Sequence, residues 1–231
     1  MPRFRLAVLA AAVLASLPAC STPDANPASG QSSAQRVNAG APDHQPGAVS
    51  LEGWKAETFP LPPGFAPELP TGTESLRFAP GWRDPSAEGF WSYAFVMWID
   101  EPVPDAARIR DLLEKYYNGL MTSFAAGASK DISGTPARVD VVRTAPNRYE
   151  ARMHLIDAFA TFKPVDLRVL VETVAEADAR AILRIQVSPR PKEHMIWRSL
   201  AAAIASIPPR EAATPEKPGD MPPALKQDGA R

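Results

Sequence analysis

A second cysteine is missing from this chain of 231 residues, which contains only Cys20. The chain therefore cannot form an internal disulfide, and a C-x-x-C redox or metal motif is excluded. Only three histidines are present, and they do not form an H-E-x-x-H pair. The glycine-rich signatures of nucleotide sites and the G-x-S-x-G elbow of hydrolases are also absent. We therefore expect no cofactor and no metal, and we favour a non-catalytic protein.

An excess of positive charge is lacking as well. The chain has 25 lysines and arginines against 26 acidic residues, which gives a formal net charge of −1. Residues 1–19 contain two arginines and no acidic residue, so the rest of the chain is more acidic still. Nucleic-acid binding depends on a basic surface that neutralises phosphates. The charge balance therefore excludes nucleic acid as the expected partner.

No apolar run near the N-terminus is long enough to cross a bilayer. The apolar stretch from Leu6 to Leu17 has about 12 residues, whereas a membrane-spanning helix needs about 20. It follows the basic residues Arg3 and Arg5 and precedes small residues that lead to Cys20. This three-part layout predicts a secretory signal peptide over residues 1–19.

The sequence Leu17-Pro18-Ala19-Cys20 resembles the lipobox of bacterial lipoproteins. In that family the cysteine is lipidated, the signal is cut before it, and the new amino group is acylated. The resemblance implies a membrane anchor on Cys20, and Ser21 after it implies the outer membrane in a cell that has two. Pro18 departs from the family pattern, and an ordinary secretory signal that leaves a soluble exported protein is the alternative.

Composition divides the remainder of the chain into three parts. Residues 20–50 are rich in Ser, Ala, Pro, Gly, Asn and Gln, and residues 208–231 are rich in proline. Such segments bury too little apolar surface to offset the entropy of ordering, so we expect a disordered tether and a disordered tail. Residues 51–207 are long enough for one domain with its own core.

Hydrophobic periodicity predicts an α+β domain. Segment 90–99 is apolar on both faces, as expected of a strand covered on both sides. Apolar residues at helical spacing predict amphipathic helices over 104–124 and 193–207. A short strand is expected at 75–79, and four alternating segments predict an antiparallel sheet with one wet face: 138–141, 148–155, 166–172 and 180–187.

The predicted order is β-β-α-β-β-β-β-α, with both helices packed on the apolar face of the antiparallel sheet. This layout is distantly similar to the compact domains of the PsbP and Mog1 families, which also open with a segment rich in proline and aromatic residues. The similarity is an analogy and carries no functional claim.

Two groups of residues are candidates for contact with a ligand or partner. The wet face of the sheet carries Arg152, His154, Arg168 and Arg184, which would form either ordinary cross-strand pairs or a docking face for an anionic ligand or a protein partner. Trp82 and Trp91 belong to a segment rich in aromatic residues that begins at Trp54 and is interleaved with the prolines of residues 60–70. We expect this segment to form an irregular strap, which would either pack the core or cover an apolar or sugar-stacking pocket.

Three functions follow from these candidates. We favour an envelope protein that binds a partner through its domain. A carrier or sensor of an apolar small molecule would need an enclosed cavity of roughly 300 Å³ or more. An envelope enzyme would need His154 to share a concave site with a carboxylate or with His194.

Overall fold

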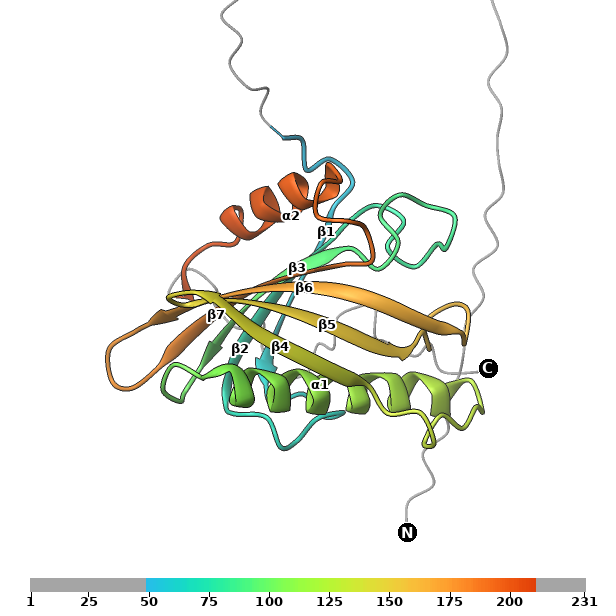
Figure 1. Cartoon of the computed structure of the whole chain (residues 1–231), viewed down its shortest axis with the longest axis horizontal. Coiled ribbons are helices and arrows are strands. Elements are labelled where there is room, and N and C mark those ends of the chain that lie inside the picture. Colours follow the sequence, from blue (N-terminus) through green and yellow to red (C-terminus); the bar gives the residue numbers. More distant parts are fainter. Residues whose placement is uncertain (1–48, 211–231) are drawn as a thin grey trace, which may run out of the picture. The chain divides into compact units, whose positions relative to one another are not determined.

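A computed structural model describes residues 49–210 of the chain (Figure 1). The predicted signal peptide over residues 1–19 and the predicted lipidation at Cys20 lie outside the described residues. So do residues 20–48 of the predicted tether and residues 211–231 of the predicted tail.

The described residues form a seven-stranded antiparallel sheet with two helices, which confirms the α+β class. The strand order is β1-β2-β3-β7-β6-β5-β4, and α1 follows β3 while α2 follows β7. The elements are β1 (Lys55–Leu61), β2 (Gly72–Phe78), β3 (Tyr93–Ile99), α1 (Ala106–Gly127), β4 (Arg138–Ala145), β5 (Arg148–Ile156), β6 (Pro164–Ala175), β7 (Ala181–Ser188) and α2 (Ile196–Ala205).

The first strand, β1, was not expected from the sequence. It pairs with β2 along its whole length, with Lys55 opposite Phe78 and Leu61 opposite Gly72. The interpretation of this stretch as an irregular strap is therefore wrong, and the observed order has one more strand at its start. A proline such as Pro60 is tolerated here because β1 is an edge strand, where a missing amide donor can face away from the ladder.

The two helices lie on opposite faces of the sheet, as Figure 1 shows. The prediction that both pack on one face is wrong. The larger core joins α1 to one face of β3 through residues such as Phe95, whereas a smaller core joins α2 to the other face through Ala94, Trp197 and Leu200. The apolar residues on both faces of β3 are what make a second covering helix favourable.

Helix α1 begins where Asp105 caps it, its carboxylate accepting a hydrogen bond of 2.8 Å from the backbone N–H of Arg108. Its apolar stripe is buried against the sheet. On another side the chain approaches the helix closely at Gly119, where an added Cβ would lie 2.0 Å from the carbonyl oxygen of Phe65. Only a glycine leaves room for that approach.

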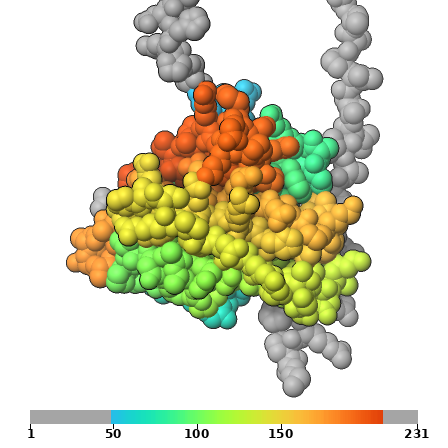
Figure 2. Space-filling view, in the orientation of Figure 1, coloured from blue at the N-terminus to red at the C-terminus, as the bar shows by residue number. Residues whose placement is uncertain are grey.

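Helix α2 covers only part of its face of the sheet. It packs on β3 and β7, whose outward residues are buried or half-buried. Strands β4 and β5 keep alternating exposed residues on this face, and in Figure 2 their yellow surface lies between α1 and α2. The uncovered part of the sheet is therefore the region where the predicted polar face is open to a partner.

Candidate functional site

An aromatic cleft lies between α1 and the adjoining face of the sheet. Its walls come from β1, β2, β3, α1 and the loops over residues 62–71, 79–92 and 157–163. The free volume is only about 50 Å³. The cleft is lined mainly by rings, which include Phe78, Trp82, Tyr93, Tyr116, Phe124 and Phe159.

The guanidinium of Arg83 lies against three rings of this aromatic cleft. Its Cζ atom lies 4.6 Å from the ring centroid of Trp82, 5.4 Å from that of Phe124 and 5.2 Å from that of Phe159. The three rings hold it by cation–π attraction. Desolvation lowers the pKa of the guanidinium, and the charge of Glu57 at the same cleft opposes this shift.

A buried carboxyl group contacts Tyr116, one of the rings that line the aromatic cleft. Glu74 has no exposed surface, and its Oε1 accepts a hydrogen bond of 3.0 Å from the hydroxyl of Tyr116. Burial raises the pKa of Glu74 to about 8, although the Tyr116 hydrogen bond acts in the opposite direction. The charge of Glu57 raises it further. Its Oε2 finds no hydrogen-bond partner among the described residues.

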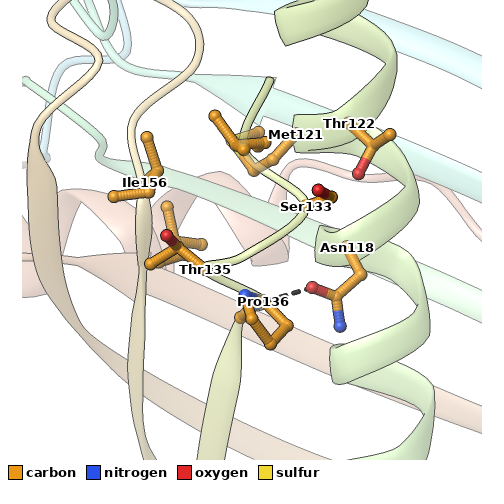
Figure 3. A pocket seen from close by; sticks show the side chains of 10 residues that line it. Asn118, Met121, Thr122, Ser133, Thr135, Pro136 and Ile156 are labelled. Carbon is orange, nitrogen blue, oxygen red and sulfur yellow. Dashed lines mark hydrogen bonds between the residues drawn. The ribbon is translucent and has the colours of Figure 1, made fainter. Parts of the chain in front are cut away.

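A second pocket, whose lining includes the hydroxyl side chains of Thr122, Ser133 and Thr135, lies between α1, the loop before β4 and the end of β5 (Figure 3). Its volume is about 270 Å³. Asn118 and Thr122 project from α1 on one side and Ile156 lies opposite them. The Oδ1 of Asn118 accepts a hydrogen bond of 2.6 Å from the backbone N–H of Ala137. Neither hollow reaches the size of roughly 300 Å³ at which ligand pockets usually begin.

On the opposite face of the sheet, Arg152 of β5 and Arg168 of β6 stand directly opposite each other. We call these two residues the arginine pair. Side chains in such positions have Cβ atoms about 4.5–5.5 Å apart, and like charges there repel each other. Asp140 of β4 faces Arg152 in the register but forms no ion pair with it within 4.0 Å.

The neighbouring acidic side chains are engaged with other cations. Glu150 pairs with Lys192, and Glu172 lies 3.8 Å from Arg184. The Oδ1 atom of Asp166 lies at a hydrogen-bond distance of 2.8 Å from Nδ1 of His154. Within the part of the chain that the structure describes, the arginine pair is thus left without a carboxylate in ion-pair range.

The predicted contact residues of the wet face therefore share one face of the sheet but have different surroundings. Arg184 and His154 are paired with acidic side chains, whereas Arg152 and Arg168 are not. His154 is exposed on an open surface, and His194 is engaged elsewhere, 3.2 Å from Glu88. The structure does not bring the two histidines together, and residues 49–210 contain no group of three candidate metal ligands.

The two predicted tryptophans are also placed differently. Trp82 lines the aromatic cleft and stacks on Phe78 with centroids 4.5 Å apart. Trp91 has no exposed surface, and its indole nitrogen has no partner among the described residues. Trp91 is therefore a core residue that an external ligand does not reach in this structure.

Sequence reasoning missed Glu74 and Arg83. A signal for Glu74 exists, because Glu74, Leu76 and Phe78 alternate along one face of β2, which places an acidic residue in a buried series. No comparable signal exists for Arg83, since its contacts with Phe124 and Phe159 join segments far apart in the sequence.

None of the helices in residues 49–210 has the length and hydropathy needed to span a membrane. No family model, no curated protein and no solved structure matches the chain.

Proposed function

We propose that this chain is a lipid-anchored protein of the cell envelope whose folded domain binds an acidic segment of a partner protein without catalysing a reaction. The anchor is Cys20, at the end of the lipobox-like sequence. The docking surface is the face of β4 and β5 that α2 leaves uncovered, together with the adjoining end of β6, and it contains the arginine pair Arg152 and Arg168.

The observation that carries this proposal is the arginine pair itself. Two opposed guanidinium groups with no carboxylate in range among the described residues are an unfavourable arrangement for the domain alone. Paired carboxylates from a partner would relieve the repulsion, because each arginine offers a planar fork of donors that matches a carboxylate.

The mixed charge of the surface favours a protein partner over a membrane or a polyanion. Asp140, Glu150, Asp166 and Glu172 stand on the same face as the arginine pair. These carboxylates would repel a uniformly negative surface, whereas a protein segment can place its acidic side chains between them. Exposed Val142, with 64% of its surface accessible, adds an apolar contact at the edge.

Site-specific photo-crosslinking in intact cells tests this proposal. A benzophenone side chain in place of Val142, next to the docking surface, should yield one discrete protein adduct. Charge reversal of the pair (Arg152→Glu with Arg168→Glu) should reduce that adduct at least tenfold. The matched control is Arg110→Glu with Arg198→Glu, which changes the net charge equally at two exposed sites on the helices and should leave the adduct intact.

The crosslinked peptide of the partner should contain aspartate or glutamate. The yield of the adduct should fall when salt is added before crosslinking, because salt screens the charged contact. An adduct that survives reversal of the arginine pair, or a product that consists of lipid rather than protein, would contradict the proposal. Circular dichroism of both double variants shows whether each is folded.

Neither other function is as well supported. A carrier of an apolar molecule would need a larger hollow than the 50 Å³ and 270 Å³ found in the described domain. An enzyme that uses His154 would need a concave site, and its exposed pair with Asp166 lies on the open sheet surface.

A further inference from the structure

The aromatic cleft holds a cation that belongs to the chain itself. Arg83 is an exposed residue of the loop between β2 and β3, and its guanidinium lies against Trp82, Phe124 and Phe159. Within the described residues the guanidinium has no hydrogen bond and no ion pair within 4.0 Å, in contrast to Arg108, which binds Glu101 and Asp111. The three ring faces are therefore its direct contacts, and the charge of Glu57 at the same cleft acts on it from a greater distance.

The rest of the aromatic cleft is also suited to a positive group. Its lining contains no cation besides Arg83, and it contains the carboxylate of Glu57. Aromatic walls are the usual means by which proteins recognise quaternary ammonium and related cations, and the carboxylate of Glu57 adds a charge of the opposite sign.

The remaining space shows how a ligand would enter. About 50 Å³ is free while Arg83 is in place, far below the roughly 300 Å³ at which ligand pockets usually begin. The aromatic cleft therefore accepts a further group only when the Arg83 side chain leaves. Because Arg83 is exposed and has no polar partner in the described domain, it can leave without breaking a hydrogen bond to that domain.

We propose that the aromatic cleft is a binding site for a small organic cation, a guanidinium or alkylammonium group, and that Arg83 occupies it in the ligand-free protein. The ligand's charged head takes the place of the Arg83 guanidinium between Trp82, Phe124 and Phe159, while the remainder of the ligand stays in solvent. This site is on the α1 side of the sheet and is independent of the arginine pair.

The test uses the full-length protein, with methylguanidinium as the probe and the indole N–H signal of Trp82 as the NMR readout. Loss of that signal in Trp82→Phe assigns it. In Arg83→Ala, methylguanidinium should shift the signal saturably. In the wild type the same shift should require at least about tenfold more probe, because Arg83 competes at an effective concentration on the order of millimolar or above.

Three controls distinguish specific binding of a cation from non-specific filling of the space that Arg83→Ala leaves. Methylurea has a similar shape without the charge and should cause no saturable shift. Arg110→Ala removes an exposed arginine of α1 that lies outside the aromatic cleft and should behave as the wild type does. Glu57→Gln in the Arg83→Ala background should weaken methylguanidinium binding severalfold, because a carboxylate near the cation is lost.

Arg83→Gln keeps a long side chain and serves if Arg83→Ala does not fold. The proposal is overturned if neither folded variant shows saturable binding of methylguanidinium, or if methylurea binds equally well. It is also overturned if the wild type shows no binding up to roughly 100 mM probe, a concentration below the molar range in which guanidinium salts unfold proteins, since the cleft would then be closed to external cations. Equal affinity in the wild type and Arg83→Ala would refute the role of Arg83 as the occupant.

Discussion

Replacing Glu74 with glutamine should remove a large part of the pH dependence of stability. Glu74 is fully buried and its pKa is raised from an ordinary value of 4.5 to about 8, chiefly by burial. Glutamine has the same shape and carries no charge at any pH. Its carbonyl oxygen can still accept the hydrogen bond from the Tyr116 hydroxyl.

The sign of the change in unfolding free energy with pH depends on whether the folded or the unfolded chain holds the proton. Below pH 4.5 the carboxyl group is protonated in both the folded and the unfolded chain. Between 4.5 and about 8 the unfolded chain has released the proton while the folded chain retains it, so the free energy of unfolding falls as pH rises. Above about 8 the folded carboxyl group is ionised too, and the decline ends.

The magnitude follows from the width of that window. Each pH unit within it costs about 1.4 kcal/mol, so the full interval from 4.5 to about 8 corresponds to a loss on the order of 5 kcal/mol. A domain of this size has a total stability of about 5–15 kcal/mol. The wild type should therefore be distinctly less stable at pH 8 than at pH 5 because of this one side chain.

Urea unfolding at pH 5, 6, 7 and 8, followed by tryptophan fluorescence, measures the effect. The useful quantity is the difference in free energy of unfolding between Glu74→Gln and the wild type, since contributions of other groups cancel in it. That difference should rise with pH in favour of the variant. Glu57→Gln, at a half-buried carboxylate whose pKa is also raised, should give a smaller rise. Parallel curves for Glu74→Gln and the wild type would refute the reasoning.

Three further predictions concern other parts of the molecule. Gly119→Ala should destabilise the domain by about 1–3 kcal/mol in urea unfolding, because the new Cβ would lie 2.0 Å from the Phe65 carbonyl oxygen; a stabilisation, as helix propensity alone would give, would contradict the close approach. Leu200→Ala should cost about 2–5 kcal/mol in the same assay, since Leu200 is fully buried between α2 and the sheet; a loss below about 1 kcal/mol would show that α2 is only loosely packed. Cys20→Ala should abolish incorporation of labelled fatty acid in cells, and unchanged labelling would rule out the proposed anchor.

The strands with one wet face were well predicted from sequence, because period-two alternation states directly which side chains are buried. In β5, which covers the alternating segment predicted over 148–155, the apolar residues Tyr149, Ala151, Met153 and Leu155 are all buried. Helix α1 was predictable for the same reason, since its apolar stripe has a clear helical period.

The face that α2 covers was not predictable from its own sequence. An amphipathic stripe shows that a helix packs on something, but it does not name the face of the sheet. The relevant information lay in β3, where Ala94 and Val96 on one face are buried as well as Phe95 on the other. Strand β1 was missed for a different reason, because prolines argue against a central strand and leave an edge strand allowed.

The two candidate sites also differ in how far the sequence could predict them. Alternation placed Arg152, His154 and Arg168 on one face, and the structure agrees, since the register sets Arg152 opposite Arg168 and His154 opposite Asp166. The contact of Arg83 with Phe124 and Phe159 is decided by tertiary packing, which no local pattern of residues encodes.

The loop over residues 79–92 that carries Arg83 has a second attachment. The guanidinium of Arg190, just after β7, donates hydrogen bonds of 3.1 Å and 3.2 Å to the carbonyl oxygens of Ala87 and Glu88. His194, in the segment that leads into α2, lies 3.2 Å from Glu88. The same loop thus contacts aromatic rings on the α1 side of the sheet and the segment before α2 on the opposite side. A cation that enters the cleft must displace the Arg83 side chain, and it can do so with or without moving the backbone of the loop. Only a movement of the loop would shift Ala87 and Glu88 and so transmit binding in the cleft to α2 on the opposite face of the sheet.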